Sequence, residues 1–404
     1  MKRLLSLLLV LAGSAPVCAQ TNSLVFTPLA ALPDGGRYAM AYCQDQTYFY
    51  MVGGGSPQTA FTSEVFRYDP AANSWGATPL STGQVPEHRL AKAVLLNPGT
   101  GSARLYVLNG ATIAGPMPAM FSLLPGNGTL ASTFSNDVPA NQAGLATWNG
   151  RLYAYGGLRT NGTFTNELRS FDPATGVWTA LAPMPEAKNT YGAAVNGKIY
   201  AVGGYNGVVN SARVDAYDIA TNQWQALGTL PTTVSNQAVA VQGEWLWLVG
   251  DFTNQSYLAA YNTRTGQLRT FTSNLPPRRN AAAVIHNNHL YVWGGNTAAS
   301  NASTLADMWQ TSLSGVLASP AARRLPQLAV YPNPSVSGEF TLKLPAGTRS
   351  IEVRDALGRR VQTVTPPAQA GTYQLQLGTQ PAGVYTVRVR TGQGWSAPSQ
   401  LLRQ

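Results

Sequence analysis

One stretch of the sequence decides the fold: residues 192–204 read GAAVNGKIYAVGG. Two apolar runs flank the pair Asn196-Gly197, and the second run ends in the doublet Gly203-Gly204. An Asn-Gly pair between such runs predicts a β-hairpin, because both turn residues must adopt positive φ. The glycine doublet predicts a sharp bend at a strand end where a side chain would clash.

The same pattern recurs along the first three hundred residues. An aromatic and two apolar residues precede a glycine pair whose first position falls at 53, 109, 156, 203, 250 and 294. The copies Asn109-Gly110 and Gly250-Asp251 are degenerate. The steps of 56, 47, 47, 47 and 44 residues indicate stacked supersecondary units.

Each unit is predicted to have four strands, the third ending in an aromatic residue and Asp, with a Trp on the fourth. The Trp follows the aromatic residue by seven positions in three units, at Tyr68 and Trp75, Phe171 and Trp178, and Tyr217 and Trp224. This arrangement resembles the kelch repeat over roughly residues 22 to 313. The resemblance implies an all-β, six-bladed β-propeller. An ordinary β-sandwich with accidental glycine pairs is the alternative.

The ring of blades needs a closing strand, since an open sheet edge invites aggregation. Residues 25–29 and Leu32-Pro33 match the fourth strand and its following loop in other units, with Phe26 in the place of the Trp. The last unit ends near Trp309 without a fourth strand of its own. We therefore expect the amino-terminal strand to complete the sixth blade.

The amino terminus reads MKRLLSLLLVLAGSAPVCAQ and has the charge, apolar run and small residues of an export signal, predicted over residues 1–19. Lipid attachment at Cys18 is the alternative, although Val17 occupies a place where a small residue is usual. Cleavage after Ala19 leaves Cys43 as the one cysteine, so we expect no intramolecular disulfide. No later apolar stretch is long enough to span a membrane.

A second domain is predicted at the carboxyl end. Residues 314–327 have a linker's composition, and residues 328–404 alternate between apolar and polar positions, as in a small immunoglobulin-like β-sandwich. The block resembles the C-terminal sorting domain of the type IX secretion system in three motifs: YPNP at 331–334, DALGR at 355–359 and PAGVY at 381–385. The resemblance implies a Gram-negative bacterium, recognition by the secretion machinery, and a secreted or surface-attached product.

Candidate binding residues lie at one mouth of the predicted propeller, where loops usually carry function. Six polar residues precede the inner strands at comparable points: Arg37, Arg89, Asn141, Lys188, Asn236 and Arg279. Four more follow the glycine doublets: Arg159, Asn206, Asn254 and Asn296. We expect the propeller to span residues 20–313. We expect these side chains to surround its mouth and to bind a glycan or a protein there. Alternatively, they solvate the rim and hydrogen-bond between blades.

Enzymatic interpretations have less support, and we expect no catalytic residue, metal or cofactor. Copper oxidases resembling galactose oxidase use the kelch fold, and they need two Tyr, two His and a Tyr-linked Cys. Cys43 stands alone on a predicted inner strand, and His88, His286 and His289 do not supply a second suitable His. Sialic acid epimerases resemble this chain in being six-bladed kelch propellers. The cluster Glu87-His88-Arg89 is the one group that could serve an isomerase of that kind as acid and base.

The formal net charge of +10 is unevenly distributed. Residues 1–19 carry +2, residues 315–404 carry +7 and the predicted propeller carries +1. The propeller therefore lacks the basic stripe of a nucleic-acid-binding domain, and nucleic acid is not an expected partner. We expect a monomer outside the cytoplasm.

Overall fold

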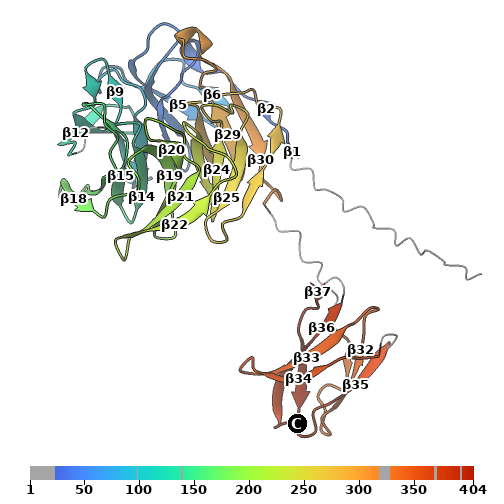
Figure 1. The fold of residues 1–404 in the computed structure, drawn as a ribbon. Coiled ribbons are helices and arrows are strands. Elements are labelled where there is room, and N and C mark those ends of the chain that lie inside the picture. Colours follow the sequence, from blue (N-terminus) through green and yellow to red (C-terminus); the bar gives the residue numbers. More distant parts are fainter. Residues whose placement is uncertain (1–22, 98, 138–139, 318–327, 368–370, 392–393) are drawn as a thin grey trace, which may run out of the picture. The chain divides into compact units, whose positions relative to one another are not determined.

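The computed structural model describes residues 23–97, 99–137, 140–317, 328–367, 371–391 and 394–404. The chain divides into two compact units, the first ending at Val316 and the second beginning at Leu317 (Figure 1). Each is built of β-strands and is described by itself. The predicted signal peptide and residues 318–327 of the predicted linker lie outside the described residues.

The first unit contains, among its described residues, six four-stranded antiparallel sheets, each of which we call a blade. Blade 1 consists of β3 (Ala41–Gln44), β4 (Phe49–Gly54), β5 (Thr62–Asp69) and β6 (Ser74–Trp75). Blade 2 consists of β7 (Lys92–Leu96), β8 (Arg104–Leu108), β11 (Ala119–Leu123) and β12 (Leu130–Ser135). Blade 3 consists of β14 (Gly144–Trp148), β15 (Arg151–Tyr155), β17 (Leu168–Asp172) and β18 (Val177–Leu181).

Blade 4 consists of β19 (Asn189–Val195), β20 (Lys198–Tyr205), β21 (Arg213–Asp218) and β22 (Gln223–Thr229). Blade 5 consists of β23 (Ala238–Gln242), β24 (Trp245–Val249), β25 (Leu258–Asn262) and β26 (Leu268–Thr270). Blade 6 consists of β28 (Ala282–His286), β29 (His289–Trp293), β30 (Met308–Ser312) and β2 (Thr27–Pro28). Smaller elements are β1 (Ser23–Leu24), β9 (Ala111–Thr112), β10 (Gly115–Pro116), β13 (Ala140–Asn141), β16 (Leu158–Arg159), β27 (Thr272–Ser273) and the 3-10 turns η1 (Pro33–Gly35) and η2 (Asn301–Ser303).

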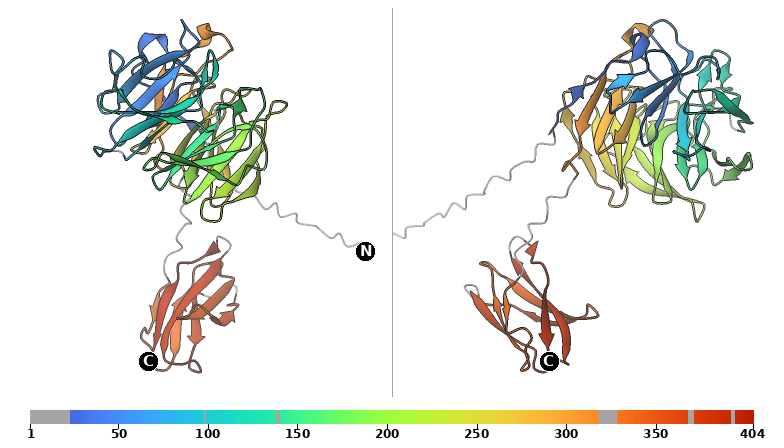
Figure 2. Two further views of the ribbon diagram at one scale, coloured as in Figure 1. Left: turned by 90° about the vertical axis from the view of Figure 1, so that its left-hand side faces the viewer. Right: turned by 180° about the vertical axis from the view of Figure 1, so that it is seen from behind.

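The blades form a closed ring. Each inner strand lies beside the inner strand of the next blade, in the order β3, β7, β14, β19, β23 and β28, and β28 lies beside β3 again. The two views in Figure 2 show the sequence colours passing around the unit, and the orange strands return beside the blue ones. The predicted β-propeller is therefore the fold of the first unit.

The amino-terminal strand closes the ring, as the sequence predicts. Strand β2 pairs with β30 of blade 6, with Thr27 opposite Gln310 and Pro28 opposite Trp309 (Figure 1). One step along this ladder Phe26 faces Thr311, the place that Trp224 takes opposite Tyr217 in blade 4. Phe26 is 2% exposed. The sixth blade thus joins strands from both ends of the propeller sequence.

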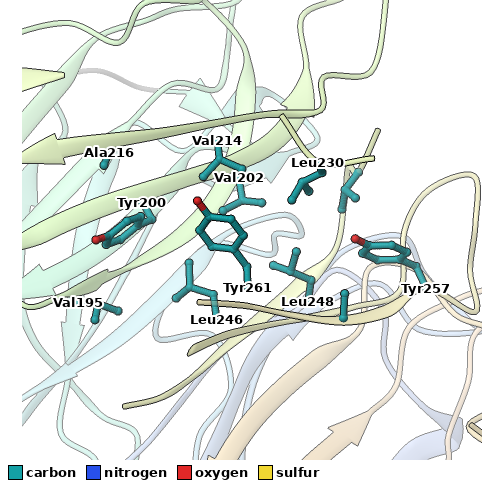
Figure 3. Close-up of a cluster of buried hydrophobic side chains, with 12 residues drawn as sticks. Val195, Tyr200, Val202, Val214, Ala216, Leu230, Leu246, Leu248, Tyr257 and Tyr261 are labelled. Atoms are coloured by element: carbon teal, nitrogen blue, oxygen red, sulfur yellow. The ribbon is translucent and has the colours of Figure 1, made fainter. Parts of the chain in front are cut away.

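The core lies mainly between neighbouring blades. Figure 3 shows the cluster between blades 4 and 5, where Tyr200 and Val214 of one blade pack with Leu246, Leu248 and Tyr261 of the next. All five are buried. Further out, the repeated aromatic pairs pack ring against ring, with centroids 5.0–5.4 Å apart in Tyr68–Trp75, Phe171–Trp178 and Tyr217–Trp224. The repeat residues therefore have a structural role.

The glycine doublets sit where one blade meets the next. Gly203 and Gly204 have φ of 63° and 111°, a region that L side chains rarely adopt. A Cβ on Gly203 would lie 2.1 Å from the carbonyl oxygen of Val234, and one on Gly204 would lie 1.9 Å from that of Asn189. In the degenerate copy Asn109-Gly110 of blade 2, Asn109 takes the place of the first glycine and has a positive φ of 61°.

The second unit is a two-sheet arrangement. One sheet holds β31 (Val330–Tyr331), β32 (Glu339–Lys343) and β35 (Thr372–Gln376), and the other holds β33 (Ser350–Asp355), β34 (Arg360–Val364), β36 (Gly383–Thr391), β37 (Gly394–Trp395) and β38 (Ser399–Arg403). Phe340, Val353 and Leu401 are among its fully buried core residues. The last strand is an integral part of this unit, because β38 pairs with β36 from Gly383 opposite Arg403 to Val387 opposite Ser399.

Candidate functional site

The mouth of the propeller is built from the segments before the inner strands and the loops after the doublets, together called the rim. In four blades the carbonyl of one pre-strand residue accepts a hydrogen bond from the second doublet residue of the preceding blade. We call this the clamp position. It is occupied by Arg37 (from Gly295, 2.7 Å), His88 (from Gly54, 2.8 Å), Lys188 (from Gly157, 3.0 Å) and Val234 (from Gly204, 2.8 Å).

Two predicted rim residues, Arg37 and Lys188, prove to be buried at clamp positions, each 1% exposed. Arg37 pairs with Asp34 at 2.6 Å and Glu64 at 3.0 Å, and Lys188 pairs with Glu186 at 3.2 Å. A buried charge needs such partners, since desolvation is otherwise costly. The expected ring of exposed donors is therefore interrupted at both positions, whose cations already have carboxylate partners within the protein.

Arg89 directly follows the clamp residue of blade 2, and Asn141 and Arg279 lie before the inner strands of blades 3 and 6. Each of the three pairs with a residue of the loop after a doublet. Arg89 donates to the hydroxyl of Tyr38 at 2.8 Å, and Arg279 lies 4.1 Å from the centre of the Phe252 ring. The half-buried Arg89 and the buried Arg279 are thus held by aromatic neighbours through cation–π contacts.

Three Asn side chains form a chain of hydrogen bonds across blades 5 and 6. Asn236 donates to Asn280 at 2.9 Å, and Asn280 donates to Asn296 at 3.0 Å. Asn236 and Asn280 also have φ near 55°, which Asn tolerates better than most residues. The predicted residues Asn236 and Asn296 are therefore brought together by Asn280, a residue that the repeat alignment did not single out.

The remaining predicted residues lie on loops after the doublets. Arg159 forms an ion pair with Glu167. Asn206 donates to Glu186 at 3.1 Å and accepts from the amides of Val208 and Val209, while Asn254 is exposed. Much of the polarity of this rim is therefore used in shaping its own loops.

The sequence prediction overlooked apolar side chains on these same loops. Ile113 is 92% exposed, Val208 84% and Phe252 48%, and they follow the doublets of blades 2, 4 and 5. Between them in the ring, Phe164 of blade 3 packs edge-on against Tyr205 of blade 4 with ring centroids 5.8 Å apart. The available signal was a large apolar residue in each of these loops.

The cluster considered for acid–base chemistry is divided by the fold. Glu87 is exposed, whereas His88 is fully buried at a clamp position beneath Gly53, and a Cβ there would meet its ring at 2.6 Å. Burial lowers the pKa of His88. Across the described part of the chain, no three His, Cys, Asp or Glu side chains converge as metal ligands would.

Fold and rim together define a β-propeller with a glycine-doublet repeat, followed by a second β-unit. A family model described as the KLHDC2/KLHL20/DRC7 Kelch-repeats domain matches residues 36–251 and, in a second alignment, residues 129–295. These matches cover more than half of the chain, which therefore belongs to the kelch-repeat family. A second model, the secretion system C-terminal sorting domain, matches residues 329–401.

Similar proteins match only part of the chain. "Kelch-like protein terF" of Aspergillus terreus is 30% identical over 209 residues, covering 45% of this chain and 43% of its own length. "Kelch-like protein 24" of Rattus norvegicus is 30% identical over 144 residues (34% and 21%), and "Kelch-like protein 28" of Homo sapiens is 27% identical over 134 residues (30% and 24%). The chain thus spans less than half the length of each.

The sorting domain identifies the chain as a secreted or surface-attached protein handled by a secretion system. Within the described ranges, no helix has the length and apolar character needed to cross a membrane.

Proposed function

We propose that the chain is an exported, non-catalytic kelch propeller that binds a protein through its rim. The observation that carries this proposal is the set of exposed apolar side chains, Ile113, Val208 and Phe252, on three loops after the doublets. Exposed apolar groups beside polar ones are typical of protein-binding surfaces. Glycan binding at the same rim is the competing outcome, and carbohydrate isomerisation would require the divided Glu87 and His88 to cooperate.

The rim proposal is tested with the mature chain on intact cells of the native host. We expect saturable binding that protease treatment of the cells abolishes and periodate treatment preserves. The variant Ile113→Ser/Val208→Ser/Phe252→Ser should lose at least about tenfold in affinity, as interface centres do. A control variant changes exposed apolar residues on the blades away from these loops: Val177→Ser/Leu227→Ser.

Three results would contradict this proposal. Binding that resists protease but is lost on periodate treatment would identify a glycan. Equal binding by both variants would show that the rim is not the contact surface. Conversion of a sugar that stops on Glu87→Gln would show that the propeller is an enzyme.

We also propose that residues 1–19 direct export to the periplasm of a Gram-negative cell. We further propose that the secretion machinery recognises the second unit at a groove on its surface. Two of the three sorting motifs, residues 355–359 and 381–385, line one cavity of about 570 Å³. Leu357 and Val384 there are 78% and 44% exposed, so the core does not account for them.

The groove is tested by secretion of the full chain. Leu357→Asp should leave the melting temperature unchanged and retain the protein in the cell, whereas Val336→Asp, on a residue 76% exposed outside the groove, should be secreted normally. Normal secretion of Leu357→Asp would argue against this surface.

A further inference from the structure

The inner strands enclose a cavity of about 340 Å³ along the axis of the propeller, to which all six blades contribute. Its wall is mainly small and apolar, and its ionisable residues are Lys92, Tyr42, Cys43 and Tyr191. No Asp, Glu, His or Arg is among the residues lining it. The volume lies within the range of small-molecule sites.

The cavity is narrow at the rim and open at the other end. Tyr42, Lys92, Tyr191 and Gln237 also line a second cavity of only about 20 Å³, which lies on the rim side. These four side chains therefore separate the two cavities. At the opposite end, where the hairpin turns lie, the lining residue Val241 is 39% exposed, so that the large cavity is entered from there.

The ammonium of Lys92 has no carboxylate partner among the described residues. Its Nζ lies 3.7 Å from the centre of the Tyr191 ring. By contrast, Lys188 and Lys198 both pair with acids. Burial lowers the pKa of Lys92 to about 7. A cation so placed is stabilised when an anion enters the cavity.

Two further polar side chains at the narrow end can each form an additional hydrogen bond. Gln237 is 3% exposed; its Nε2 donates to the carbonyl of Val202 at 2.9 Å, and its buried Oε1 has no hydrogen-bond partner among the described residues. The hydroxyl oxygen of Tyr42 accepts from the amide of Val239 at 3.4 Å, which leaves its own proton to donate. The end of the cavity thus offers a cation, a donor and an acceptor.

We propose that this cavity binds a small hydroxylated carboxylate, such as a sugar acid, with the carboxylate at Lys92 and Tyr42 and a ligand hydroxyl donating to Gln237. The charge of the carboxylate compensates Lys92, and the hydroxyl satisfies a buried acceptor that is otherwise costly. The ligand enters at the hairpin end, opposite the rim. The site is independent of the proposed protein-binding rim.

The experiment titrates the mature full chain with D-glucuronate and, as the neutral match, D-glucose, using calorimetry. We expect saturable glucuronate binding, at least about tenfold weaker glucose binding, and at least about tenfold weaker glucuronate binding by Lys92→Met. Lys198→Met is the control variant, because Lys198 pairs with Asp218 and does not line the cavity. It should bind glucuronate as the unchanged chain does. Binding should weaken from pH 6 to pH 9 as Lys92 loses its proton, since Tyr42, Cys43 and Tyr191 all have raised pKa values and stay neutral up to about pH 9.

The proposal is overturned if the unchanged chain does not bind 50 mM glucuronate, if glucose binds equally well, or if Lys92→Met retains full affinity. Should Lys92→Met fail to fold, the NMR signal of ¹³C-dimethylated Lys92 in the unchanged chain decides: a shift with glucuronate alone supports the site, and no shift overturns it. The rim variant Ile113→Ser/Val208→Ser/Phe252→Ser should bind glucuronate normally, so failure of either proposal is recognised separately.

Discussion

The closing strand offers the most direct test of how the ring is held together. Replacing Phe26 with Ala removes a side chain that is 2% exposed and occupies the Trp place of blade 6. Truncation of a buried Phe costs about 3–5 kcal/mol. For a unit that ends at Val316, an unfolding entropy of about 2.1 cal/mol/K per residue amounts to roughly 0.6 kcal/mol/K. The expected fall in melting temperature is therefore roughly 5–8 °C.

The assay is differential scanning calorimetry of the mature chain, following the transition of the propeller. The matched control is Val25→Ala, the neighbouring residue on the same segment, which is 72% exposed and should shift the transition by less than about 1 °C. Equal shifts for the two variants would refute the reasoning, because the pairing of β2 with β30 would then contribute nothing through Phe26.

Three further predictions concern the blade seams. Gly203→Ala should lower the melting temperature by several degrees, because its Cβ would lie 2.1 Å from a carbonyl oxygen; Gly126→Ala, with open space around it, should not, and similar melting curves would contradict this. Arg278→Met removes a fully buried guanidinium that pairs with the partly exposed Asp307 at 2.9 Å and donates to the carbonyl of Gly294 at 3.1 Å, and it should cost about 1–3 kcal/mol, against less than about 1 kcal/mol for the exposed Arg264→Met, as measured by denaturant unfolding. Because burial lowers the pKa of His88, the unfolded chain binds its proton first as the pH falls below about 6.5, and stability should drop between pH 7 and pH 5; a His88→Gln variant with an unchanged pH slope would count against this origin.

The central cavity shows why the composition of a repeat is a poor guide to its binding site. Lys92 belongs to an inner strand whose neighbours in sequence are apolar, and nothing in the repeat distinguishes it. Its lack of an acidic partner depends on which side chains five other blades present to the same axis. That is a property of the assembled ring, so sequence spacing could not reveal it.

The rim residues show the same limit in another form. Aligning repeats by sequence placed Arg37, Arg89 and Asn236 in one set, but the backbone hydrogen bonds assign them to three successive positions. A shift of one residue turns a side chain from the rim into the seam between blades. Arg37 and Lys188 are buried for this reason, whereas Arg89, one position further along, is half-buried and pairs with a loop residue of the rim.

The sequence by itself determined the architecture. Glycine doublets, Asn-Gly turns and the aromatic-to-Trp step each reflect a local requirement of the backbone or of packing. In the folded blades the glycines adopt positive φ, and the aromatic residue lies opposite the Trp, as the sequence pattern predicts. The amino-terminal strand and the sorting motifs were readable for the same reason. Only the tertiary structure decided which charges are paired, which apolar groups are exposed and what the channel contains, because these depend on residues from blades that meet only when the ring closes.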